Sequence, residues 1–175
     1  MHWTLQNRHV FISHSRTLDL SHNPLFDIGI DRLSLGCRGM SRLTFLDLSR
    51  TSFSDPGAIS LARAFRHLIS LVHLNLSSNT IHQQGTGILA QSLEALADLQ
   101  HLDLGDNPGL GDDTAMTLVP ILPRLRGLTY LGLWRTSIGQ EGAAALAPSL
   151  WRLTGLVNLD VRATPGWGNK AGGGT

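Results

Sequence analysis

The 175-residue chain is long enough for one globular domain with a substantial core. Its 42% hydrophobic and 15% charged residues are typical of a globular protein and exclude an intrinsically disordered chain. A formal net charge of +1 provides little attraction to nucleic acid or to an anionic membrane, so neither is expected as a partner. Cys37 is the single cysteine, and the first residues lack the pattern of a secretory signal, so a cytoplasmic location is expected.

Most of the chain is a repeat. Residues 1–14 come first and predict an irregular segment or partial cap. From 15 to 164 the phrase L-x-x-L-x-L recurs about six times, every 28 residues and once after 29, which predicts one repeat domain. Residues 165–175 predict a flexible glycine-rich tail, because no helical pattern follows the last phrase. The central leucines of the phrase are Leu18, Leu46, Leu74, Leu102, Leu131 and Leu159.

Each unit predicts a short strand, a turn and a helix. Alternation around the central leucine indicates the strand. An Asn or Thr five residues later marks the turn, and apolar residues 15 and 19 positions later mark one helical face. Asp55-Pro56-Gly57 predicts a capped helix start, while Pro120 and Pro148, further inside two helices, predict local kinks or tighter turns. The turn residues are Asn23, Thr51, Asn79, Asn107, Thr136 and Thr164.

These residues resemble the leucine-rich repeat family, in its long ribonuclease-inhibitor-like class, which includes the Ran GTPase-activating protein. The resemblance implies an α/β fold, a right-handed solenoid or horseshoe with a parallel sheet on the concave face and helices on the convex face. It also implies that the turn asparagines bond the backbone of neighbouring coils. Physics favours the same picture, because a single 28-residue unit cannot bury enough apolar surface and must stack on its neighbours. Both ends of the array lack a regular cap, so the sequence predicts a piece of a longer array or end-to-end self-association.

Alternation places the residues on either side of each central leucine in the concave hollow. The candidate protein-binding residues there include Phe45, His73, His101 and Asp103. Trp134 replaces a small residue of the other copies and, with Tyr130, Arg135 and Arg162, has the composition of an interface hot spot. Two readings of Trp134 stay open, a binding residue beside space left by Gly132 or a shield over neighbouring turns.

The sequence contains no serine–histidine–acid set, phosphate loop or cysteine zinc pair, so it indicates no enzyme, cofactor or metal site. A metal held by His73 and His101 is the weaker interpretation of two exposed histidines. The expected function is non-catalytic protein–protein recognition by the concave face, with an unidentified protein partner. The alternatives are a small-GTPase regulator like the Ran GTPase-activating protein, or a sensor or adaptor segment of an innate-immunity or ubiquitin-ligase protein.

Overall fold

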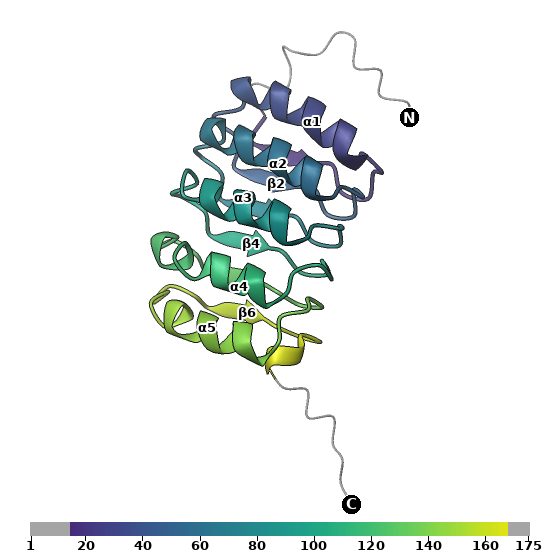
Figure 1. The fold of residues 1–175 in the computed structure, drawn as a ribbon. Coiled ribbons are helices and arrows are strands. Elements are labelled where there is room, and N and C mark those ends of the chain that lie inside the picture. Colours follow the sequence, from purple (N-terminus) through teal and green to yellow (C-terminus); the bar gives the residue numbers. More distant parts are fainter. Residues whose placement is uncertain (1–14, 168–175) are drawn as a thin grey trace, which may run out of the picture.

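A computed structural model describes residues 15–167. The expected cap at 1–14 and most of the expected tail lie outside this part of the chain. Within it, strands alternate with helices, and short 3-10 turns follow several helices (Figure 1). The elements are β1 Thr17–Asp19, α1 Phe26–Gly36, η2 Cys37–Gly39, β2 Phe45–Asp47, α2 Asp55–Ala64, η3 Phe65–His67, β3 His73–Asn75, α3 Gln83–Leu93, β4 His101–Asp103, α4 Asp112–Leu118, η4 Leu122–Arg124, β5 Tyr130–Gly132, α5 Gln140–Leu150, β6 Asn158–Asp160 and η5 Pro165–Trp167.

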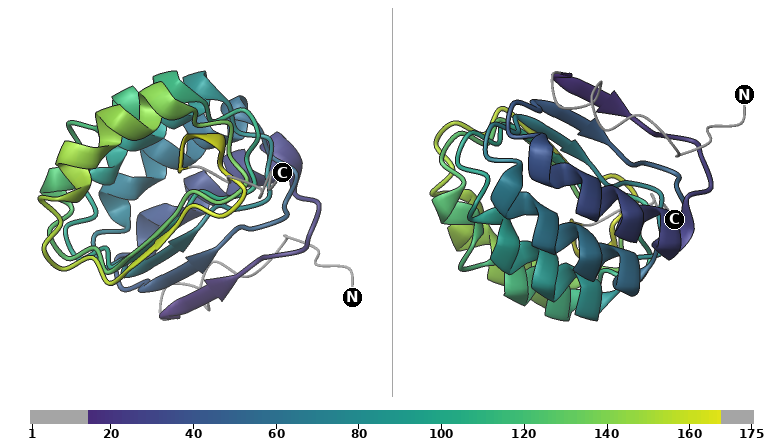
Figure 2. Two further views of the ribbon diagram at one scale, coloured as in Figure 1. Left: turned by 90° about the horizontal axis from the view of Figure 1, so that it is seen from below. Right: turned by 90° about the horizontal axis from the view of Figure 1, so that it is seen from above.

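The six strands form one parallel sheet in sequence order, β1 to β6, and the central leucines pair with one another. Figure 2 shows the sheet on one side of the stack and the helices on the other. The alternating α/β solenoid predicted from the repeat is therefore confirmed. Because the repeats pair in register, equivalent residues form columns along the molecule, and adjacent strands lie about 4.8 Å apart.

The core lies between the sheet and the helices. Leu46, Leu74, Leu102 and Leu131 are fully buried. Most helix positions that the spacing predicts are buried too, but Leu33 in α1 and Leu150 in α5 are only partly buried. The end leucines, Leu18 and Leu159, are only partly buried, because each packs against one neighbouring coil instead of two. Burial of a coil thus depends on both of its neighbours, as expected for a solenoid.

The turn asparagines bond across coils as the family resemblance implies. The Asn79 side chain donates to the carbonyl of Leu48 one coil away, and its oxygen accepts from the Thr51 amide. Asn107 repeats the pattern with the Leu76 carbonyl and the Ile81 amide. The hydroxyl of Thr136 instead bonds only within its own turn, to the Leu133 carbonyl 2.8 Å away. The fourth and fifth coils therefore lack this cross-coil bond.

A second set of bonds ties the helix starts together. Asp27, in α1, accepts from the Ser54 and Gly57 amides at the start of α2. Asp55 was predicted to cap its own helix, but its side chain accepts from the His82 amide of the next coil at 2.7 Å. The prediction was wrong because helix starts lie side by side in the stack, so an aspartate in the first turn reaches the free amides of the next helix. Asp112 continues the pattern on Gly139 and Gly142.

This pattern changes between α3 and α4. Gln83 occupies the position held by an aspartate in α1, α2 and α4. The facing position, a glycine in the neighbouring helices, is Thr114, whose buried hydroxyl has no hydrogen-bond partner within residues 15–167. A glycine is required at the regular positions, because a side chain on Gly85 or Gly142 would overlap the preceding aspartate or alanine. The two replacements therefore occur together: α3 has Gln83 instead of an aspartate, and the facing position of α4 has Thr114 instead of a glycine.

The structure also bears on the sequence predictions made for the two helix prolines, for Cys37 and for the start of the C-terminal tail. Pro148 lies inside α5, whereas α4 ends at Leu118, two residues before Pro120. Cys37 is fully buried, as predicted, and burial raises the pKa of its thiol to about 11. Residues 165–167, expected to begin a flexible tail, form η5, and Trp167 packs against the core.

Replacing Asp112 tests the contribution of the helix ties. Asp112→Ala leaves the amides of Gly139 and Gly142 without their acceptor, so we expect a loss of about 1–2 kcal/mol in unfolding free energy. Asp113→Ala is the matched control, because this exposed neighbour carries a similar charge near the same helix start. Its cost should stay within about 0.5 kcal/mol. Urea unfolding followed by circular dichroism measures both; equal losses would contradict the assignment.

Candidate functional site

The concave face, meaning the side of the sheet opposite the helices, carries a stack of four rings. Phe45, His73, His101 and Tyr130 are equivalent residues of β2 to β5, so the register places them side by side. Their centroids are separated by 4.3, 3.9 and 4.0 Å, and their planes differ by 15° or less. We call these four side chains the ring ladder. Each is partly exposed, so the ladder forms a continuous flat stripe in the hollow.

Stacking keeps both histidines of the ladder neutral. Burial and, to a smaller extent, the neighbouring His73 together lower the pKa of His101 to about 4. Burial also lowers the pKa of His73, against the attraction of Asp47 and Asp103. At the other end of the ladder, burial and nearby carboxylates raise the pKa of Tyr130 to about 12. At neutral pH the ladder is therefore an uncharged surface with hydrogen-bonding ring edges.

The acidic column beside the ladder has a structural function. Each carboxylate accepts a hydrogen bond from the backbone amide two residues later, which fixes the turn that leaves the strand. The residue three positions after each column residue has φ between 50° and 58° in all six coils. The column comprises Asp19, Asp47, Asn75, Asp103, Gly132 and Asp160.

Gly132 interrupts this column, and the neighbouring side chains fill its place. A Cβ atom on Gly132 would overlap the carboxylate of Asp103. A Cβ atom on Gly105 would overlap the indole of Trp134 in the same way. The prediction of open space beside Gly132 is thus wrong, because Asp103 leans into the room that the missing side chain leaves.

Trp134 crosses from the fifth coil to the fourth. Its Nε1 donates to both carboxylate oxygens of Asp103, at 3.1 and 3.3 Å. Asp103 is only 8% exposed, and this burial raises its pKa despite the bonds from the indole and the Gly105 amide. Trp134 thus connects the fourth and fifth coils, between which Thr136 makes no cross-coil bond. Its ring covers Asp103 and Gly105, as expected of a shielding residue, and it also remains partly exposed to solvent.

The predicted arginines lie at the same end of the concave face but are not free. Arg162 bonds Asp160 through two nitrogens, at 2.9 and 2.7 Å, and holds the pKa of that carboxyl below its usual range. Arg135 contacts Asp106 at 3.3 Å and is largely exposed. The structure therefore brings Tyr130, Trp134 and Arg162 to one end of the hollow, while Phe45 lies at the other end of the ladder.

The ring ladder offers recognition chemistry, a flat uncharged surface with hydrogen-bonding ring edges. Within residues 15–167 no three or more His, Cys, Asp or Glu side chains gather in a metal-binding group. In the same part of the chain, no helix combines the length and apolar character needed to cross a bilayer. The sequence columns placed the ladder residues together, but the Trp134–Asp103 bond had no signal beyond the paired departures at Gly105 and Gly132.

The comparisons with known proteins agree with this geometry. A family profile described as Leucine Rich repeat matches residues 41–62, 67–85 and 95–119. Together with the stacked strand–helix coils, this decides the fold. The chain is a leucine-rich-repeat solenoid. No curated protein sequence matches it.

Two solved structures share this leucine-rich-repeat fold over most of the chain. The tropomodulin C-terminal domain of Caenorhabditis elegans has a TM-score of 0.67 at 17% identity, covering 81% of this chain and 85% of the other. A structure titled Leiomodin-1 Actin-Binding Site 2 has a TM-score of 0.67 at 18% identity, covering 82% and 81%. At these identities the likeness concerns the fold alone.

Glycine-to-alanine substitutions test how closely the Trp134 indole packs on the neighbouring coil. Gly105→Ala displaces the indole from Asp103, so we expect a loss of about 1–3 kcal/mol in unfolding free energy. The control, Gly87→Ala, lies in α3 with nothing within 4 Å of the added carbon. It should gain about 0.5–1 kcal/mol, because alanine favours a helix. Denaturant unfolding measures the change in unfolding free energy for each variant. A Gly105→Ala variant that is more stable than the wild type would contradict the close packing of Trp134 on Gly105.

The neutral histidines predict a pH dependence. Because the folded pKa of His101 lies near 4 and the unfolded value near 6.5, the unfolded chain takes up the proton first as the pH falls. Stability is therefore complete above about pH 6.5 and decreases toward pH 4, by on the order of 1 kcal/mol for a half-exposed ring.

His101→Phe keeps a ring in the ladder and should flatten this part of the pH profile of unfolding free energy. His82→Gln, on the exposed start of α3, is the control and should keep the wild-type slope. If both variants keep the wild-type slope, the stacked histidine is not the source of the pH dependence.

Proposed function

We propose that this leucine-rich-repeat solenoid is a non-catalytic recognition module that binds a protein partner on its concave face. The ring ladder is the observation that supports the proposal. Four partly exposed rings are already stacked in the free protein, so they lose little rotamer freedom when a partner covers them. Aromatic side chains of this kind supply much of the binding energy at protein interfaces.

The surroundings of the ladder are those of an interface. Partly exposed Asp47 and Asn75 lie along one side and form a polar margin, and they are joined by a 3.0 Å hydrogen bond. At the far end Tyr130, Trp134, Arg135 and Arg162 extend the surface, as expected of an interface hot spot. Asp103 contributes indirectly in this proposal, because it is buried beneath the indole that it holds.

Repeat length supports a finer assignment within the family. Spacing of 28 and 29 residues, with a full α-helix in most coils, is what we expect of the ribonuclease-inhibitor-like class. A cytoplasmic setting is part of the same proposal, since the single thiol is buried and unpaired. One of the two structural neighbours is named as an actin-binding site. Actin is therefore a defined partner to test, although the likeness at 18% identity concerns the fold.

A ladder variant tests the proposal. The double variant His73→Ser/Tyr130→Ser removes two rings from a partly exposed surface and leaves the leucine core unchanged. Crosslinked partners of the wild type are identified by mass spectrometry and their dissociation constants measured with purified proteins. We expect the variant to bind at least about tenfold more weakly. A separate sedimentation assay with filamentous actin tests the named candidate.

Two tryptophans provide the matched control. Trp134→Phe keeps a ring on the concave face but loses the bond to Asp103, whereas Trp151→Ala removes an 86% exposed ring at the end of α5. Trp151→Ala should keep full affinity. A partner that binds the ladder variant normally, or that is lost with Trp151→Ala, would show that binding uses another surface.

A further inference from the structure

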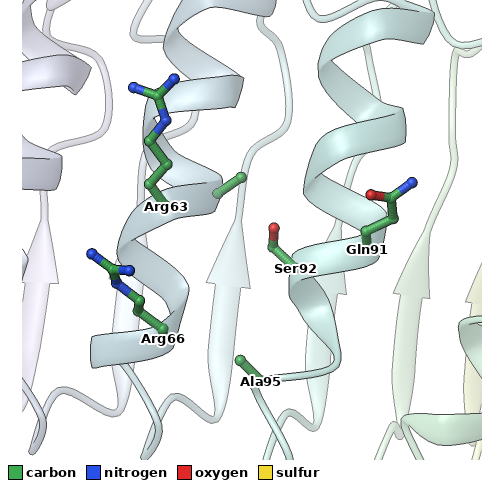
Figure 3. A pocket seen from close by; sticks show the side chains of 6 residues that line it. Arg63, Arg66, Gln91, Ser92 and Ala95 are labelled. Atoms are coloured by element: carbon green, nitrogen blue, oxygen red, sulfur yellow. The ribbon is translucent and has the colours of Figure 1, made fainter.

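On the convex side, a groove separates α2 from α3. Its volume is about 370 Å³, and small residues allow it to form, because Ala62 and Ala95 leave room between the two helices. In Figure 3, Arg63 and Arg66 extend from the α2 side, and Gln91 and Ser92 extend from α3. Ile88, 37% exposed, lies one helical turn before Ser92 in α3 and so stands beside the groove.

The two arginines of the groove have no acidic partner in residues 15–167. Arg66 donates from its Nε to His67 at 3.2 Å, which leaves its terminal nitrogens available. The nearest acid in the equivalent column is Glu94, which pairs instead with Arg124 of the following coil at 2.6 Å. Two guanidinium groups thus stand one helical turn apart without a counter-charge.

The positive charge extends over two coils. Arg38 is the equivalent of Arg66 one repeat earlier, 28 residues away. No aspartate or glutamate occurs in residues 32–46 or 56–73, which together contain five arginines. Three of them, Arg38, Arg63 and Arg66, lie near the C-terminal ends of helices and complement the helix dipole, but the other two have no such role. These two coils therefore carry more positive charge than is needed to complement the helix dipoles.

We propose that this groove binds a peptide segment carrying a phosphorylated side chain. A phosphate group brings about two negative charges and three acceptor oxygens, enough for both arginines at once. All cationic side chains except Lys170, outside the described residues, are arginines, whose planar forks bind phosphate through two hydrogen bonds. The floor is largely apolar, and exposed Ile88 offers contact to an apolar residue beside the phosphate. This favours a peptide over a free ion.

Binding requires the arginines to change rotamer. In Figure 3 both guanidinium groups extend on the outer surface of α2 and do not reach across to α3. Both side chains are exposed, so their rotation is fast and unhindered. The side-chain amide of Gln91 also points away from α2 in Figure 3, and it adds a further donor after a similar rotation. This site lies on the opposite side of the sheet from the ring ladder and does not rest on the function proposed there.

Fluorescence anisotropy tests the site with a nine-residue labelled peptide that has one central phosphoserine between two leucines and no other charged side chain. We expect saturable binding that weakens with added salt, and no binding of the unphosphorylated peptide. Arg63→Gln/Arg66→Gln should weaken binding by roughly tenfold or more, and Arg66→Lys should weaken it partly, because lysine keeps the charge but loses the fork. Thermal unfolding checks that each variant folds.

Arg152→Gln is the matched control, because it removes an exposed arginine from the loop after α5. It should leave affinity for the phosphopeptide unchanged. Equal losses in the control and the groove variant would indicate unspecific attraction and overturn the proposal. So would equal binding of both peptides, competition by inorganic phosphate at the same concentration as by the phosphopeptide, or binding to phosphatidylserine vesicles without peptide binding.

Discussion

In-register pairing of six three-residue strands is the constraint on which the other features of this molecule depend. Because each strand pairs with its own copy in the next repeat, every side chain faces its equivalents above and below. The ring ladder is a direct consequence, since four flat side chains in one column must stack. The same constraint partly buries His73 and His101 in the stack, and this burial is the main reason that the pKa values of both rings are lowered.

Column geometry also explains why irregular residues occur in sets. A change at one position alters the space available to the neighbouring coil, so a second change accompanies it. Trp134 requires Gly105 beneath it, and Gly132 gives Asp103 the room to accept the indole hydrogen. On the convex side, Gln83 in place of an aspartate coincides with Thr114 in place of a glycine. The presence of Trp134 is thus explained by its contacts with Gly105 and Asp103 of the fourth coil.

Sequence columns therefore predicted the fold, the buried leucines and the residues that face the hollow, because these depend only on repeat spacing. The stacking of the four rings was not predicted. They did not predict the partner of Asp55, because a helix-start aspartate can reach either its own amides or those of the next helix. The left-handed turn at Arg50 and Arg135 was equally hidden, since neither residue type favours φ near 50°. Gly132 was misread for a related reason: a missing side chain indicates space, but not which neighbour occupies it.

Charge separates along the same columns, so the two sides of the solenoid offer different chemistry. Aspartates gather where strands end and helices begin, where their oxygens accept free amides. Arginines gather at the opposite ends of the helices. Ion pairs such as Arg162–Asp160 neutralise the acidic edge in part, while Arg63 and Arg66 keep their charge. A partner that covers the neutral ring ladder and one that brings phosphate to the convex groove would therefore not compete for the same residues.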